Sequence, residues 1–121
     1  MKFISLQHIS IEDPGTFKDF LIEDGHSITT IQLDEGDSIP NNLDEFDAML
    51  CMGGPMDTFM EDQYPWLVAE KKAIGEYVLN LKKPFLGFCL GCQLLGEVLG
   101  GEVVESKPPE IGVLDLSLIH I

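Results

Sequence analysis

Short apolar runs alternate with helical patterns along this chain, and the alternation predicts the order of its elements. Runs that are mostly apolar or rich in β-branched residues predict strands, and they lie at 2–9, 26–33, 47–52, 84–89, 101–106 and 110–121. The run at 47–52 (DAMLCM) is almost wholly apolar, as in a strand that is buried on both faces of a parallel sheet.

Helical patterns fill the gaps between the first strands. One helix should begin at Asp13-Pro14, because Asp can cap a helix and Pro fits its first turn. The clearest pattern covers 66–83, where an apolar stripe recurs at helical spacing and leaves Glu70 on the polar side. A shorter helix is expected at 90–99.

This order of elements predicts an α/β fold with a parallel sheet covered by helices on both faces. The length of 121 residues suits a single domain. In such sheets, ligand sites lie at the carboxyl ends of the strands. Gly53-Gly54 follows the third strand and Cys89 follows the fourth, so we expect these two breaks to lie close together.

The composition restricts the classes of partner. The chain carries 21 acidic and 7 basic side chains, for a formal net charge of −14, and all the basic residues are lysine. Such a surface repels phosphate backbones and anionic lipid, so we expect no nucleic-acid and no membrane partner. No apolar run approaches the ~20 residues of a membrane span. Three cysteines do not make a disulfide framework, which favours a reducing, cytoplasmic location.

The stretch GFCLGCQ (87–93) has the spacing of a nucleophile on a sharp strand-to-helix turn. Such a turn needs small residues two positions either side of the nucleophile, and Gly87 and Gly91 supply them around Cys89. The start of the following helix favours the thiolate form of the cysteine.

Backbone donors for an oxyanion are available beside this turn. The N–H of Leu90 would face an oxyanion formed on the substrate, and Gly54 can bring a second bare N–H close to it. Gln93 lies one helical turn after Cys89 and could hydrogen-bond a polar substrate.

These residues resemble a known family. The heptapeptide 87–93 fits the G-x-C-x-G-x-Q motif of class I (triad-type) glutamine amidotransferases, and C-M-G-G-P-M-D (51–57) matches the glycine break that precedes it. The stretch 61–74 resembles stand-alone members similar to the amidotransferase domain of GMP synthase. The resemblance covers essentially the whole chain. It implies a three-layer, flavodoxin-like sheet and hydrolysis of the side-chain amide of glutamine, with no cofactor and no metal.

The resemblance also implies a role for each candidate residue. Cys89 would attack the carboxamide to give a glutamyl thioester and ammonia, and the N–H groups of Gly54 and Leu90 would hold the oxyanion. Gln93 and Gly53 would contact the bound glutamine. The implied partners are glutamine and an ammonia-accepting synthetase or other acceptor substrate.

One part of the family pattern is absent. In that family a histidine in an H-x-E motif activates the cysteine, but His8, His26 and His120 are the only histidines here and none heads such a motif. We therefore interpret 1–121 as the N-terminal part of an amidotransferase domain, truncated and with an incomplete sheet. Little or no glutaminase activity is expected unless a partner supplies the histidine.

Other interpretations stay open from the residues. Cys89 and Cys92 form a C-x-x-C at a helix start, which is also typical of a redox site, although Cys92 and Cys51 are predicted to be core residues. A DJ-1-like cysteine hydrolase would carry an acidic residue near the first strand, where only Glu12 and Asp13 occur. A non-catalytic glutamine-binding fragment is the third alternative.

Overall fold

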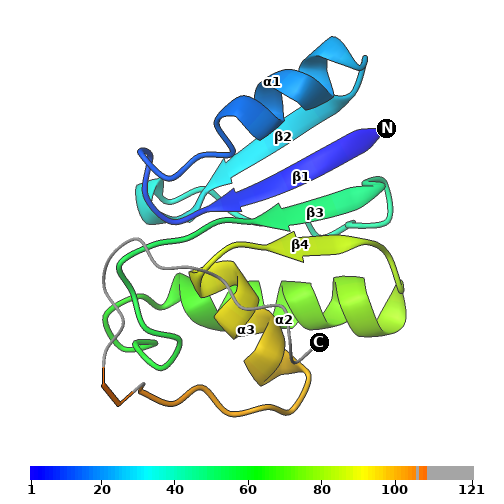
Figure 1. The fold of residues 1–121 in the computed structure, drawn as a ribbon. Coiled ribbons are helices and arrows are strands. Elements are labelled where there is room, and N and C mark those ends of the chain that lie inside the picture. The colour runs from blue at the N-terminus through cyan, green and yellow to red at the C-terminus, as the bar shows by residue number, and fades with distance from the viewer. Residues whose placement is uncertain (106, 109–121) are drawn as a thin grey trace, which may run out of the picture.

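The computed structural model describes residues 1–105 and 107–108, which form one parallel β-sheet with helices on both faces (Figure 1). Its strands are β1 (Lys2–Gln7), β2 (Ser27–Gln32), β3 (Ala48–Cys51) and β4 (Phe85–Gly87), in the spatial order β2-β1-β3-β4. The three neighbouring pairs are all parallel. The order reverses between β1 and β3, as it does at the switch point of a flavodoxin-like sheet, so the predicted fold class is confirmed.

The helices divide between the two faces of the sheet. Figure 1 shows α1 (Thr16–Glu23) on one face, and α2 (Trp66–Gly75) with α3 (Leu90–Val98) on the other. A 3₁₀ turn, η1 (Leu33–Glu35), follows β2, and a π-helical segment, η2 (Glu76–Asn80), continues α2. None of the described helices is long and apolar enough to cross a membrane.

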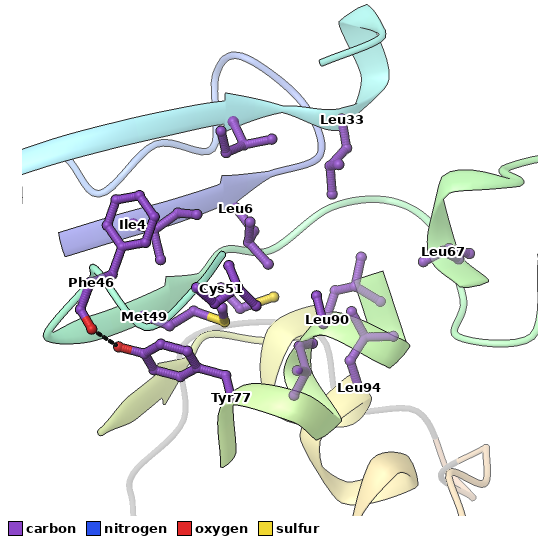
Figure 2. Close-up of a cluster of buried hydrophobic side chains, with 14 of the residues drawn as sticks. Ile4, Leu6, Leu33, Phe46, Met49, Cys51, Leu67, Tyr77, Leu90 and Leu94 are labelled. Carbon is purple, nitrogen blue, oxygen red and sulfur yellow. Dashed lines mark hydrogen bonds between the residues drawn. The ribbon is translucent and has the colours of Figure 1, made fainter. Parts of the chain in front are cut away.

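Successive strand residues face opposite sides of the sheet, and this alternation divides the core. On the α1 side, Phe3 and Leu50 form a small cluster against which Leu21 of α1 packs. The larger cluster lies on the α2 and α3 side (Figure 2). Its members include Ile4, Leu6, Met49, Cys51, Leu67, Ala73, Ile74, Tyr77, Leu90 and Leu94.

One buried hydrogen bond joins this core to the loop before β3. The hydroxyl of Tyr77 donates to the carbonyl oxygen of Phe46 at 2.9 Å (Figure 2). Burial, together with the charges of Asp47 and Asp44, raises the pKa of Tyr77 to about 12. The tyrosine therefore stays a neutral donor in the folded protein.

One predicted helix start and one predicted strand were wrong. The first helix begins at Thr16 rather than at Asp13-Pro14, because the Asp13 carboxylate accepts a hydrogen bond from the N–H of Gly15 in a local turn and not from the helix. The run 101–106 was predicted as a strand, yet its described part, 101–105, contains none. The predicted strand at 110–121 lies outside the described residues.

Candidate active site

Cys89 stands at a strained bend between β4 and α3. Its backbone has φ 51° and ψ −107°, and its side chain is exposed. A positive φ is uncommon for any residue other than glycine and is often kept at functional sites. The cysteine is the residue immediately before the first turn of α3, so the predicted strand-to-helix elbow is confirmed.

The glycines that flank the elbow leave room for the chain to fold back on itself. A Cβ atom on Gly87 would lie 2.6 Å from the carbonyl carbon of Gly91 and 2.7 Å from the backbone nitrogen of Cys92. These are backbone atoms, which cannot move aside as a flexible side chain can. The requirement for small residues on both sides of Cys89 is therefore steric.

The double-glycine segment lies beside the elbow, as the sheet topology predicted. A Cβ atom on Gly53 would lie 3.4 Å from Cβ of Cys89, and one on Gly54 would lie 3.4 Å from Cδ2 of Leu90. The carboxylate of Glu12, from the loop after β1, also reaches this place. Its Oε2 would lie 2.5 Å from a Cβ atom on Gly53. The ends of β1, β3 and β4 thus meet around Cys89.

Leu90 and Gln93 occupy the first turns of α3. The Leu90 side chain is buried, and its N–H belongs to the first helical turn, where backbone donors have no partner within the helix. Gln93 is exposed one turn later, and its backbone N–H donates to the carbonyl of Cys89 at 3.0 Å. Both residues therefore belong to the helical turns that follow Cys89 directly.

The other two cysteines differ from each other. Cys51 is buried in β3, as predicted, and burial, with the charge and hydrogen bond of Glu70, raises the pKa of its thiol well above the usual value. Cys92 was predicted to lie in the core, but it is exposed. The apolar face of α3 is formed by Leu90 and Leu94, four residues apart, and Cys92 falls on the opposite face. All three cysteines are free.

A buried histidine contacts the double glycine, and a buried glutamate contacts that histidine. His8, one residue past β1, and Glu70 of α2 are both fully buried. Nε2 of His8 lies 2.5 Å from Oε1 of Glu70, and Nδ1 lies 3.1 Å from the carbonyl oxygen of Gly53. The thiol of Cys51 donates to the same Oε1 at 3.2 Å, and the ring of Trp66 stacks on His8.

The surroundings of His8 favour its charged form. Burial by itself would lower the pKa of His8, but the hydrogen bond and charge of Glu70, the Gly53 carbonyl and the charge of Glu12 outweigh it and raise the pKa. With a proton on each nitrogen, the ring can donate to Glu70 and to Gly53 together.

Sequence reasoning missed this pair. Glu70 was placed on the polar side of its helix, but it is three residues from Leu67 and four from Ile74, both of which are fully buried. That spacing puts all three on one helix face. A charged residue at a position where the helical pattern calls for an apolar one was therefore the sign that Glu70 is buried. A buried carboxylate calls for a partner, and His8 at the end of β1 provides it.

The same three side chains could be considered as metal ligands. The donor atoms of His8, Cys51 and Glu70 lie within 4.8 Å of one another. Two ligands on a tetrahedral zinc ion with bonds of ~2.0–2.3 Å sit more than 3 Å apart, whereas His8 and Glu70 are separated by 2.5 Å. The spacing fits hydrogen bonds rather than metal coordination.

Neither described histidine is placed to act as a base for Cys89. Both ring nitrogens of His8 have partners in the buried cluster. His26 precedes β2, at the opposite end of the sheet, where its Nδ1 lies 2.9 Å from the amino terminus of Met1. His120 lies outside the described residues.

Comparison with known proteins gives one consistent family. The sequence profile of the family "Glutamine amidotransferase class-I" matches residues 17–119. The glutamine amidotransferase-like protein YfeJ of Salmonella typhimurium is 34% identical over 114 residues, which cover 92% of this chain and 47% of that protein. A subunit of the glutamine-hydrolyzing GMP synthase of Sulfolobus acidocaldarius is 36% identical over 84 residues, which cover 69% of this chain and 41% of that subunit.

Solved structures agree with the sequence matches. A glutamine amidotransferase from Thermotoga maritima superposes with a TM-score of 0.78 at 34% identity, covering 83% of this chain and 43% of its own. A glutamine amidotransferase from Methylobacillus flagellatus gives a TM-score of 0.79 at 31% identity, covering 87% of this chain and 41% of its own. This chain therefore spans less than half the length of these relatives.

Proposed function

This chain belongs to the class-I glutamine amidotransferase family, and from that premise we propose that it forms the nucleophile part of a glutamine-hydrolysing site. The observation that carries the proposal is the exposed thiol of Cys89 on a strained elbow, with Gly53 against it. Residues 1–121 would be the N-terminal part of the domain, in keeping with their share of the relatives' length.

The proposed chemistry follows from the placement of the thiol and the backbone donors. The thiolate of Cys89 attacks the carboxamide carbon of glutamine, and the N–H groups of Gly54 and Leu90 hold the oxyanion. The amide nitrogen takes up a proton and leaves as ammonia, which gives a glutamyl thioester that water then hydrolyses to glutamate. Gln93 and Gly53 would contact the substrate beside the thiol.

The proton transfers need a general base, and neither described histidine lies where it could act on Cys89. We assign that role to a group outside the described residues, supplied by a partner chain or by further sequence. The 121-residue polypeptide alone should then turn over glutamine very slowly or not at all, and act mainly as a glutamine-binding unit.

The ammonia would pass to an acceptor bound by another polypeptide or domain. This part of the proposal is supported by the relatives that are named as subunits of a glutamine-hydrolyzing GMP synthase. The strongly acidic chain suits neither a nucleic-acid nor a membrane partner. A cytoplasmic location is in keeping with its three free cysteines.

Protection of the thiols by glutamine tests the proposal. The chain carries its own control, because Cys89 and Cys92 are both exposed but only Cys89 faces the double glycine. Alkylation by iodoacetamide, followed at each cysteine by peptide mass spectrometry, should slow at Cys89 and not at Cys92 when L-glutamine is added. D-glutamine should protect neither. Equal rates at Cys89 with and without L-glutamine would contradict a glutamine site.

One observation favours a second candidate, a DJ-1-like cysteine hydrolase. The carboxylate of Glu12 lies near the elbow, because its Oε2 would lie 2.5 Å from a Cβ atom on Gly53, the glycine next to Cys89. In that case the charge of Glu12 would alter the reactivity of the Cys89 thiol. Glu12→Gln would then change the rate of Cys89 alkylation to the same extent with and without glutamine. Protection by L-glutamine in both wild type and Glu12→Gln would favour the amidotransferase.

A further inference from the structure

The carbonyl of Gly53 has an unusual partner for a loop that borders an exposed thiol. It lies 3.1 Å from Nδ1 of His8, a ring that is fully buried and stacked on Trp66. A carbonyl oxygen only accepts hydrogen bonds, so this contact requires a proton on Nδ1.

The other side of the ring carries a proton as well, so the ring is in its charged form. Glu70 receives the thiol hydrogen of Cys51 on Oε1, so its carboxylate acts as an acceptor, and Nε2 of His8 donates to the same oxygen. Glu70 comes from α2, which is packed in the core through Leu67 and Ile74. The histidine is therefore held at one nitrogen by a rigid helix and holds the loop with the other.

Stability alone is a weak reason to bury such a pair. Well-packed apolar residues of similar volume often replace a buried ion pair without loss, and here Oε2 of Glu70 is buried with no hydrogen-bond partner among the described residues. The part of the arrangement that an apolar replacement could not supply is the hydrogen bond to Gly53.

That hydrogen bond sets the direction of the neighbouring N–H. A trans peptide is planar, and its C=O and N–H point in opposite directions. When the carbonyl of Gly53 faces His8, the N–H of Gly54 in the same peptide faces away from His8. Glycine adopts many backbone conformations, so a peptide between two glycines turns easily unless a partner holds it.

We propose that His8, held by Glu70, is a positioning residue that keeps the Gly53–Gly54 peptide turned so that the Gly54 N–H faces the substrate carbonyl at Cys89. This inference rests on the proposed function, because it gives the Gly54 N–H an oxyanion to bind. His8 itself touches neither the thiol nor the substrate.

A matched pair of variants separates the two hydrogen bonds of the ring. Asn at position 8 places its amide nitrogen near the place of Nδ1, and Gln places it near the place of Nε2. His8→Asn/Glu70→Gln therefore keeps a donor for Gly53, whereas His8→Gln/Glu70→Gln keeps only the contact with position 70. Both variants remove the same charges, so a general effect of losing the ion pair would appear equally in both.

The readout is a ratio of two alkylation rates at Cys89. In a chloromethyl ketone analogue of glutamine, the thiolate displaces chloride while the ketone oxygen occupies the oxyanion position. Iodoacetamide loses iodide in the same way but has no glutamine backbone to hold its carbonyl in the site. The rate with the ketone divided by the rate with iodoacetamide therefore reports the oxyanion donors, with Cys92 as the reference.

In the wild type this ratio should be higher at Cys89 than at Cys92. It should fall by about 100-fold in His8→Gln/Glu70→Gln, since loss of one oxyanion donor costs a factor of that order, and His8→Asn/Glu70→Gln should retain most of it. A wild-type ratio that is equal at the two cysteines would overturn the proposed function and this inference with it. A high wild-type ratio with equal values in the two variants would overturn the inference alone.

A second measurement needs no variant and applies if either one fails to fold. In ¹⁵N-histidine-labelled wild type at pH 6.5, near the ordinary pKa of histidine, the chemical shifts of His8 should show Nδ1 protonated. An unprotonated Nδ1 could not donate to the Gly53 carbonyl and would overturn the proposed positioning role.

Discussion

Gly91 rests directly on the backbone of Cys51: a Cβ atom on Gly91 would lie only 2.1 Å from the Cys51 carbonyl oxygen. The first turn of α3 therefore contacts β3 with no side chain between them. This contact brings the elbow at Cys89 against the end of β3, where the double glycine begins.

The first prediction concerns this contact. Gly91→Ala should lower the free energy of unfolding by about 3 kcal/mol, the upper part of the usual range for overpacking, because the added methyl group meets backbone rather than a movable side chain. Gly96→Ala is the matched control in the same helix, since a Cβ there meets nothing within 4 Å. It should stabilise by about 0.5–1 kcal/mol. Urea denaturation of both variants measures the difference, and similar effects would contradict a steric role for Gly91.

The second prediction concerns the strain at Cys89. Cys89→Gly should raise the free energy of unfolding by about 1 kcal/mol, because glycine adopts the observed φ of 51° without a Cβ penalty. It should also abolish alkylation at the site. Cys92→Gly is the control, and it should destabilise by about 0.5 kcal/mol because Cys92 lies inside α3. A loss of stability in both variants would show that the bend carries no strain.

The sequence predicted the parts of the site that depend on local spacing. Gly87 and Gly91 lie two residues either side of Cys89, so the elbow can be identified within one heptapeptide. The prediction that Gly53 and Cys89 lie close together needed only one additional rule, that the carboxyl ends of parallel strands meet at the same edge of the sheet. Both predictions rest on backbone geometry, which short motifs encode well.

Two of the failures have a common cause, which is that burial and strand pairing depend on a partner far away in the sequence. Glu70 was predicted to lie off the apolar stripe of its helix, and His8, 62 residues away, gives no local sign of pairing with it. Residues 101–105 have β-branched character but no strand, since strand formation depends on a neighbour to pair with. No single stretch of sequence contains that information.

The third prediction concerns the carbonyl oxygen of Phe46, which receives two donors. Tyr77 donates its hydroxyl and Lys83 its Nζ, both at 2.9 Å. Tyr77→Phe alone should cost about 1 kcal/mol, because the lysine still satisfies the carbonyl. Tyr77→Phe/Lys83→Met removes both donors and should cost more than the two single variants added together. Strict additivity in urea denaturation would show that the donors do not share this acceptor.

The fourth prediction is a pH dependence that comes from His8. Its charge is faced by Glu70 from α2, by Glu12 from the loop after β1 and by the carbonyl of Gly53. The thiol of Cys51 is hydrogen-bonded to the same Glu70 carboxylate. Because the pKa of His8 is raised on folding, its contribution to stability is full below the unfolded value of about 6.5. That contribution is lost as the pH rises through the pKa of the folded state.

The stability of the wild type should therefore fall between pH 6 and 8.5 by more than that of Glu70→Gln, in which the histidine loses its charged partner. Burial would then lower the pKa of His8. The contribution of His8 to the free energy of unfolding would be lost at a lower pH or would vanish. Working below pH 9 keeps the Cys51 thiol and the Tyr77 hydroxyl protonated, since the pKa of each is raised. His26 is present in both proteins, so it cancels in the difference. Urea denaturation at intervals of half a pH unit gives the two curves, and parallel curves would show that Glu70 does not hold the charge of His8.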